Sequence, residues 1–122
     1  MRTIGHFIGG REVKGTSGRF ADVFEPMTGD VQAQVALASK AEMRAAVENA
    51  IAAQVAWGAT NPQRRARVMM KFLELAQRDY DKMADLLARE HGKTVPDAKG
   101  DIQRGLEVVE FACGVPHLMK GE

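Results

Sequence analysis

The stretch VQAQVALASKAEMRAAVENA, residues 31–50, holds the change of pattern on which the fold depends. Its first part, VQAQVAL (31–37), alternates apolar and polar residues, which is typical of a short strand. Ser39 then begins a capping box, because the side chains of Ser39 and Glu42 can each accept a hydrogen bond from the other residue's backbone N–H. The junction predicts extended structure before Ser39 and a helix after it.

Two antiparallel hairpins are predicted upstream of this junction, within residues 1–38. In the first, the pair Gly9-Gly10 separates two short runs, which favours a tight β-turn. In the second, RFADVFE (19–25) alternates in character, and the turn sequence PMTG (26–29) joins it to the strand that begins at Val31. The first third of the chain is therefore predicted to be short antiparallel β-structure.

Three or four helices are predicted within residues 39–122. Asn61-Pro62 combines an N-cap with proline at the first helical position, and Thr94 begins another helix before a proline in its first turn. Gly92 ends the long middle run of helical spacing, and Asp79 could divide that run into two helices. Apolar residues at helical spacing in the first two helices are predicted to face the core; they include Met43, Val47, Ile51, Trp57 and Phe72. The sequence alone thus predicts an α+β chain, with short hairpins followed by helices.

The composition predicts a soluble domain and favours no particular partner. The 122 residues are 45% hydrophobic, which is enough for a core. Seventeen basic and sixteen acidic side chains leave a net charge of +1, so neither nucleic acid nor a membrane surface is favoured as a partner. The first residues lack the apolar core of a signal peptide, and one cysteine cannot form an internal disulfide. We therefore expect a cytoplasmic protein.

Motifs for metals and nucleotides are not found in the sequence. His6, His91 and His117 are scattered, with no pair at helical spacing and no paired cysteines, so we expect no metal site. No G-x-G-x-x-G or P-loop follows a predicted strand, so we expect no cofactor-binding residue in this chain. No catalytic residue is predicted either.

The segment DIQRGLEVVEFACG (101–114) holds two candidate functional residues. Cys113 lies far along its helix without a cationic neighbour, which predicts a buried structural thiol and not a nucleophile. Arg104 follows Asp101 by three residues and precedes Glu107 by three, and either carboxylate can reach it on a helix. The pattern alone therefore favours an exposed ion pair for Arg104, worth about 0–1 kcal/mol.

Four segments that span most of the chain resemble one enzyme superfamily: HFIGGREVKG, FEPMTGDVQAQVALAS, AWGATNPQRRARVMMKF and LLAREHGKTVPDAKGDIQRGLEVVEFACGVPHLMKGE. The F-I-x-G opening, the P-x-T-G turn and the E-x-G-K helix end are similar to the aldehyde dehydrogenase superfamily. The stretch RGLEVVEFACG resembles its CoA-acylating methylmalonate-semialdehyde branch in particular. The resemblance covers essentially the whole chain.

This resemblance implies an α/β fold for an intact enzyme several times longer than this chain. Residues 1–122 would be the N-terminal part of its NAD-binding domain, with hairpins in 1–38 and helices in 39–122, and the Rossmann core and the catalytic domain would lie beyond them. The implied enzyme uses NAD and CoA to convert methylmalonate semialdehyde to propionyl-CoA, and malonate semialdehyde to acetyl-CoA, in valine and inositol breakdown. It would assemble as a dimer or tetramer, and this chain alone is expected to be inactive.

The resemblance also changes the interpretation of Arg104. The family places this helix beside the substrate tunnel and uses an arginine at this position to hold the carboxylate of the semialdehyde. A planar guanidinium can grip a carboxylate with two parallel hydrogen bonds, which lysine cannot do. Two alternatives stay open: a non-enzymatic helical module that binds a partner, and a segment of another semialdehyde dehydrogenase branch.

Overall fold

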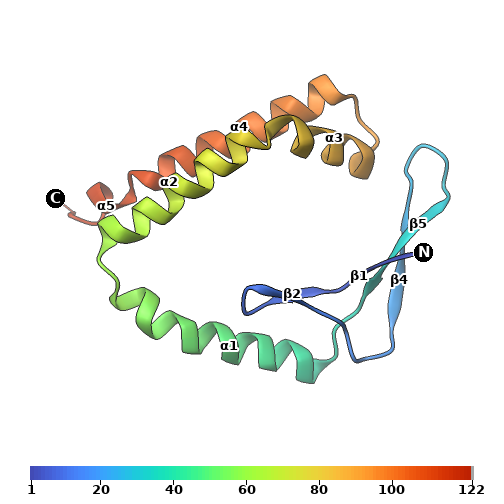
Figure 1. The fold of residues 1–122 in the computed structure, drawn as a ribbon, viewed down its shortest axis with the longest axis horizontal. Coiled ribbons are helices and arrows are strands. Elements are labelled where there is room, and N and C mark those ends of the chain that lie inside the picture. The colour runs from blue at the N-terminus through green and yellow to red at the C-terminus, as the bar shows by residue number, and fades with distance from the viewer. Residues whose placement is uncertain (122) are drawn as a thin grey trace. The chain divides into compact units, whose positions relative to one another are not determined.

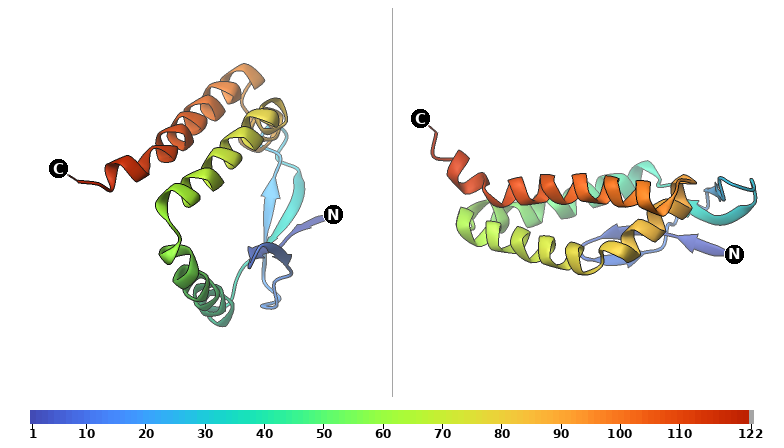
Figure 2. Two further views of the ribbon diagram at one scale, coloured as in Figure 1. Left: turned by 60° about the vertical axis from the view of Figure 1, so that its left-hand side comes forward. Right: turned by 90° about the horizontal axis from the view of Figure 1, so that it is seen from above.

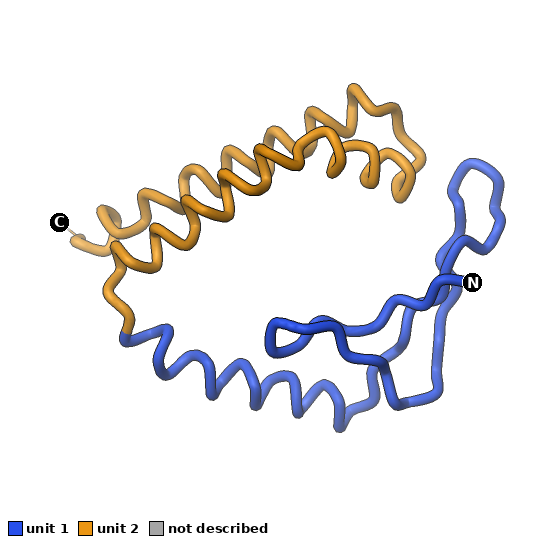
Figure 3. The backbone as a smooth tube through the Cα atoms, in the orientation of Figure 1, with its two compact units in different colours: residues 1–59 blue, residues 60–122 orange. Residues whose placement is uncertain are grey.

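The structure, a computed structural model, describes residues 1–121, which fall into two compact units (Figure 3). Unit 1 is Met1–Ala59, and unit 2 begins at Thr60. The five strands and the first helix belong to unit 1, and the remaining helices belong to unit 2 (Figure 1). The boundary between the units therefore lies after the first helix and not at the strand-to-helix junction.

The hairpin predicted around Gly9-Gly10 is present in unit 1. β2 (His6–Ile8) and β3 (Arg11–Val13) pair antiparallel, with Phe7 opposite Glu12. Gly9 and Gly10 both have positive φ, 62° and 77°, which a two-residue type I′ turn requires and which glycine adopts without steric cost. The turn residues therefore fix the register of this hairpin.

A three-stranded sheet in the order β1-β5-β4 forms the other β-structure of unit 1. β4 (Phe20–Phe24) and β5 (Val31–Ala36) pair antiparallel, which confirms the second predicted hairpin. β1 (Arg2–Ile4) pairs with β5 in parallel, and the predicted hairpins do not include this pair. The resulting sheet is mixed.

The helix α1 (Lys40–Ala59) begins at the predicted capping box. The Ser39 N–H donates to Glu42 Oε2 over 2.7 Å, and the Glu42 N–H donates to Ser39 Oγ over 3.2 Å. Glu42 Oε1 also accepts a hydrogen bond from the Thr16 N–H over 2.6 Å, which joins the segment before β4 to the start of the helix. The bonds from the Ser39 and Thr16 backbone lower the pKa of Glu42 from 4.5 to about 2.

The predicted apolar face of α1 is exposed. Met43, Val47 and Ile51 follow one another at steps of four residues, as predicted, yet no residue of the helix is buried. Trp57 was predicted to be a core residue, and its side chain is exposed as well. The residues of α1 that lie beside the β2–β3 hairpin are the small or polar Ala45, Ala46 and Asn49, so no element of unit 1 buries the apolar face of the helix.

Unit 2 is a set of four helices: α2 (Pro62–Arg78), α3 (Tyr80–His91), α4 (Val95–Cys113) and the one-turn α5 (Val115–Leu118). Both views in Figure 2 show α4 running alongside α2 and α3, which it contacts. α5 was not predicted, because a single turn leaves little periodic signal in the sequence. No helix among residues 1–121 is long and apolar enough to cross a membrane.

The predicted helix boundaries of unit 2 are confirmed. Asn61 Oδ1 accepts a hydrogen bond from the Gln63 N–H over 2.9 Å, and Thr94 caps α4. Asp79 separates α2 from α3 as predicted, although its side chain accepts hydrogen bonds from Arg78 and does not cap α3. Gly92 ends α3 in the left-handed conformation, with φ of 78°, so the chain can reverse there at little cost.

The core of unit 2 is made of small residues. Ala84 of α3 and Ala98 of α4 are both fully buried, and Leu106 is the largest buried side chain, with 8% exposed. Small side chains at a contact let two helices pack closely, which joins α3 to α4. Larger apolar residues such as Phe72, which was predicted to be in the core, and Phe111 are exposed.

Candidate functional site

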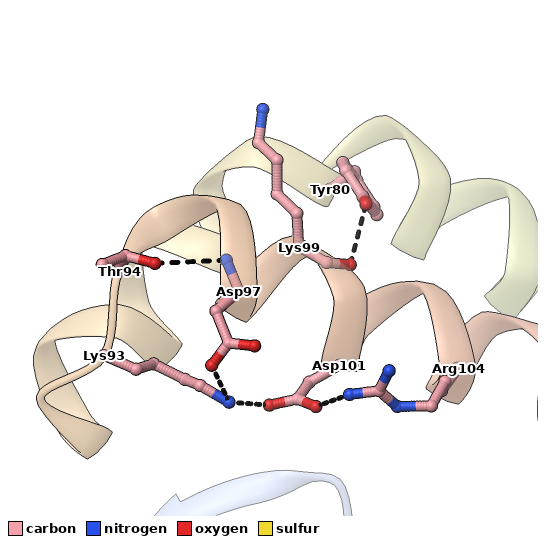
Figure 4. A network of polar contacts seen from close by, with 7 residues as sticks. All are labelled: Tyr80, Lys93, Thr94, Asp97, Lys99, Asp101 and Arg104. Carbon is pink, nitrogen blue, oxygen red and sulfur yellow. Dashed lines mark hydrogen bonds and ion pairs between the residues drawn. The ribbon is translucent and has the colours of Figure 1, made fainter.

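A row of ion pairs follows the first turns of α4 (Figure 4). Lys93 Nζ lies 2.9 Å from Asp97 Oδ2 and also bonds Asp101 Oδ2. The other oxygen of Asp101 accepts a hydrogen bond from Arg104 Nη2. The two carboxylates and two cations therefore alternate, so each anion of this network lies beside at least one cation and the four charges cancel.

Local structure explains how Lys93 joins this network although it precedes the helix. Gly92 turns the chain back after α3, and Thr94 opens α4 by accepting a hydrogen bond from the Asp97 N–H over 3.4 Å. Lys93, Asp97 and Asp101 are spaced by four residues, a separation that brings side chains to one face of a helix. The Lys93 side chain is only 15% exposed, so most of it is buried while its amino group contacts both carboxylates.

The ion pairs shift the protonation equilibria of the two central groups. Hydrogen bonds to Asp101 and then to Asp97 raise the pKa of Lys93, against an opposing effect of burial. Hydrogen bonds from Lys93 and then from Arg104 lower the pKa of Asp101. Both shifts favour the charged forms, so Asp101 is an anion and Lys93 a cation at neutral pH.

Arg104, the predicted substrate-binding residue, lies at the exposed end of the network. Its side chain is 69% exposed, and its guanidinium folds back along the helix towards Gly100 and Asp101. The bond to Asp101 is the ion pair that the spacing of the two residues predicted. A guanidinium has five N–H donors, and Asp101 engages its Nη2 group, so donors remain for a second anion such as a carboxylate.

A second set of contacts fixes α4 against α3. The Tyr80 hydroxyl donates a hydrogen bond to the Lys99 carbonyl oxygen over 2.8 Å. Lys99 Nζ lies 2.7 Å from Asp81 Oδ1 and 5.9 Å from the centre of the Tyr80 ring, within the range of a cation–π contact. The helix segment that carries Asp101 and Arg104 is thus held in place by a neighbouring helix.

The other candidate residues lie away from this network. Cys113 is half-buried at the far end of α4, not fully buried as predicted, and it lines an open cavity of about 580 Å³ together with Arg67 and His117. No group of potential metal ligands occurs among the residues that the structure describes.

Lys93 was not predicted to belong to the site. The residue lies between a helix-ending glycine and a helix-capping threonine, so it belongs to neither helix. The signal was present as K-x-x-x-D-x-x-x-D over residues 93–101, because a lysine just before a helix can reach acidic residues in its first turns. Asp101 was noted from its spacing to Arg104.

Comparison with known proteins gives the chain a family context. The model of the aldehyde dehydrogenase family matches residues 13–122. The malonate-semialdehyde dehydrogenase of Pseudomonas aeruginosa is 42% identical over 122 residues, which is 100% of this chain and 24% of the relative. The human mitochondrial methylmalonate-semialdehyde/malonate-semialdehyde dehydrogenase [acylating] is 41% identical over 98% of this chain and 22% of its own length. The chain spans about a quarter of the length of the curated relatives it matches.

Solved structures show the same similarity. A protein from Sinorhizobium meliloti that is described as a methylmalonate-semialdehyde dehydrogenase, complexed with NAD, is 61% identical with a TM-score of 0.93, over 97% of this chain and 24% of that one. The methylmalonate-semialdehyde dehydrogenase from Oceanimonas doudoroffii is 45% identical with a TM-score of 0.87, over 100% of this chain and 25% of that one. An NAD-dependent benzaldehyde dehydrogenase from Corynebacterium glutamicum also has a TM-score of 0.87, at 29% identity, over 93% of this chain and 25% of that one. These comparisons do not favour an independent helical module.

Proposed function

This chain belongs to the aldehyde dehydrogenase family, and we propose that it is the N-terminal part of the NAD-binding domain of a CoA-acylating methylmalonate-semialdehyde dehydrogenase. In this proposal, the intact enzyme converts methylmalonate semialdehyde to propionyl-CoA, and malonate semialdehyde to acetyl-CoA, with loss of carbon dioxide, in valine and inositol breakdown. The support is the 61% identity to the Sinorhizobium meliloti protein and the names of the curated relatives.

The residues of this chain do not fit a dinucleotide site. Its sheets are a mixed three-stranded sheet and a two-stranded hairpin, not the open parallel sheet that binds dinucleotides, and its sequence lacks the glycine-rich fingerprint. In our proposal NAD and CoA bind to other parts of the enzyme. This chain contributes scaffold and one substrate-binding side chain.

That side chain is Arg104, which in our proposal binds the carboxylate of the semialdehyde. The observation that carries this assignment is an exposed guanidinium that Asp101 holds through Nη2, with donors left for a second anion. A hydrogen bond to a charged group contributes about 1.5–3 kcal/mol. That energy corresponds to a preference of roughly 10- to 100-fold over an aldehyde without a carboxylate.

The proposal extends to the cellular setting of the enzyme. We propose a cytoplasmic dimer or tetramer that acts on a small semialdehyde and has no nucleic-acid or membrane partner. The net charge of +1 is consistent with the lack of a polyanionic partner. Sizing of the intact enzyme by light scattering tests the oligomeric state directly.

The first test is the substrate preference of the intact enzyme after Arg104→Ala. We expect kcat/KM for malonate semialdehyde to fall by roughly 10- to 100-fold, and that for propanal by less than about twofold, because propanal has no carboxylate. Arg104→Lys should restore only part of the loss, since an ammonium group lacks the planar pair of donors. Equal losses for the two aldehydes would contradict the proposed role of Arg104.

A further inference from the structure

We propose that Asp101 is a positioning residue for Arg104, and that Lys93 anchors Asp101 so that the guanidinium is oriented before the substrate binds (Figure 4). This inference rests on the proposed function of Arg104 in binding a carboxylate. It adds two residues that do not themselves touch the substrate and that act through the arginine.

The exposures of the three side chains support this order of dependence. They rise from 15% for Lys93 through 35% for Asp101 to 69% for Arg104, so the network runs from a group held against the protein to one that faces solvent. Lys93 is bonded to two carboxylates, Asp97 and Asp101, which restricts its motion further. The fixed end of the network is therefore Lys93, and the end available to a ligand is Arg104.

An exposed arginine on a helix has many accessible rotamers, and a ligand must select one of them at an entropic cost. The bond from Arg104 Nη2 to Asp101 selects the rotamer that folds back along α4. Because less entropy is lost when the donors are already in place, this bond should increase the affinity of Arg104 for the substrate carboxylate. Lys93 contributes by holding the second oxygen of Asp101.

Asp101 could instead compete with the substrate for the guanidinium, and the network argues against this. The Asp101 carboxylate is shared with Lys93, so part of its charge is already neutralised when it meets Arg104. It engages Arg104 at Nη2, whereas bidentate binding of a carboxylate uses two of the five donors. Arg104 can therefore keep Asp101 and bind a substrate carboxylate together.

The test is Asp101→Asn in the intact enzyme, with kcat/KM measured for malonate semialdehyde and for propanal. We expect a loss of about tenfold for malonate semialdehyde, mainly as a higher KM, and of less than about twofold for propanal. Asp101→Glu keeps the charge but moves it by one methylene, and should give an intermediate loss of about threefold for malonate semialdehyde alone. It also serves as the test if Asp101→Asn does not fold.

Glu107→Gln is the matched control. It removes the same charge three residues from Arg104 in the opposite direction, and the Glu107 carboxylate accepts a hydrogen bond from Gln103 over 3.3 Å. We expect a change of less than about twofold for both aldehydes. A loss for malonate semialdehyde as large as that of Asp101→Asn would show a general charge effect and overturn the inference.

A double-mutant cycle separates positioning from a merely structural role. If Asp101 acts through Arg104, adding Asp101→Asn to Arg104→Ala should not reduce the preference for malonate semialdehyde any further. Additive losses, equal losses for the two aldehydes, or a gain for malonate semialdehyde after Asp101→Asn would each overturn the inference. If Arg104→Ala reduces kcat/KM equally for the two aldehydes, the proposed role of Arg104 in binding the carboxylate is wrong. If Arg104→Ala mainly affects malonate semialdehyde and Asp101→Asn does not, only the positioning role of Asp101 is wrong.

Discussion

The helices α1 and α4 are almost equally long, 20 and 19 residues, and they are stabilised in different ways. α1 has no buried residue; its first turn is bonded to the Thr16 N–H through Glu42, and Ala45, Ala46 and Asn49 lie beside the β2–β3 hairpin. α4 buries Ala98 and Leu106 and packs against both α2 and α3. α1 therefore meets the rest of unit 1 through its first half without burying any residue, whereas α4 buries part of its apolar face.

The hydrogen bonds of Glu42 lie at the first turn of α1, whereas the ion pairs of α4 extend over several turns. The carboxylate of Glu42 accepts two backbone N–H bonds and fixes one turn of α1. On α4 the charged side chains from Lys93 to Arg104 extend over the first three turns and end at an exposed guanidinium. The candidate functional residue therefore lies on the helix whose position is best determined by its neighbours.

The largest effect that separates the two helices should come from overpacking. Ala98→Leu inserts a larger side chain into the fully buried contact of α3 with α4, and should lower the free energy of unfolding by about 1–3 kcal/mol. Ala52→Leu makes the same change on α1, where residue 52 is exposed, and should alter the free energy of unfolding by less than about 0.5 kcal/mol. Urea unfolding of the 122-residue chain measures both. Equal destabilisation would remove the distinction between the helices.

A smaller and pH-dependent effect should appear at the start of α1. The folded-state pKa of Glu42 is about 2, below its ordinary value of 4.5, so its hydrogen bonds stabilise the fold above pH 4.5 and are lost as the pH falls from 4.5 towards 2. Glu42→Gln should abolish this dependence, because the amide does not titrate. Hydrogen exchange of the Ser39 and Thr16 amides follows the loss directly. Protection of both amides that stays constant down to pH 2 would contradict this account.

Local signals predicted the helix boundaries well. Ser39, Asn61, Asp79, Gly92 and Thr94 all lie at the helix ends that the sequence indicated, because capping depends on residues only a few positions apart. The two hairpins were predicted for the same reason, since turn residues determine their registers. The ion pair of Arg104 with Asp101 also follows from spacing along one helix.

Contacts between residues far apart in the sequence could not be predicted from these local patterns. β1 was missed because its partner residues 33–35 are far away in the sequence and its three residues show no alternation. Burial was also mispredicted: periodicity shows which residues share a face, as Met43 and Ile51 do on α1, but not whether another element covers that face. Lys93 reaches the site across a chain reversal, which helical spacing does not describe.

The most direct measurement is a crystal structure of the intact enzyme with an unreactive analogue of malonate semialdehyde. The account predicts the Arg104 guanidinium at about 2.7–2.9 Å from both oxygens of the analogue's carboxylate, with Asp101 still bonded to Arg104 and to Lys93. A structure in which Arg104 points into bulk water, while another residue holds the carboxylate, would contradict the central claim.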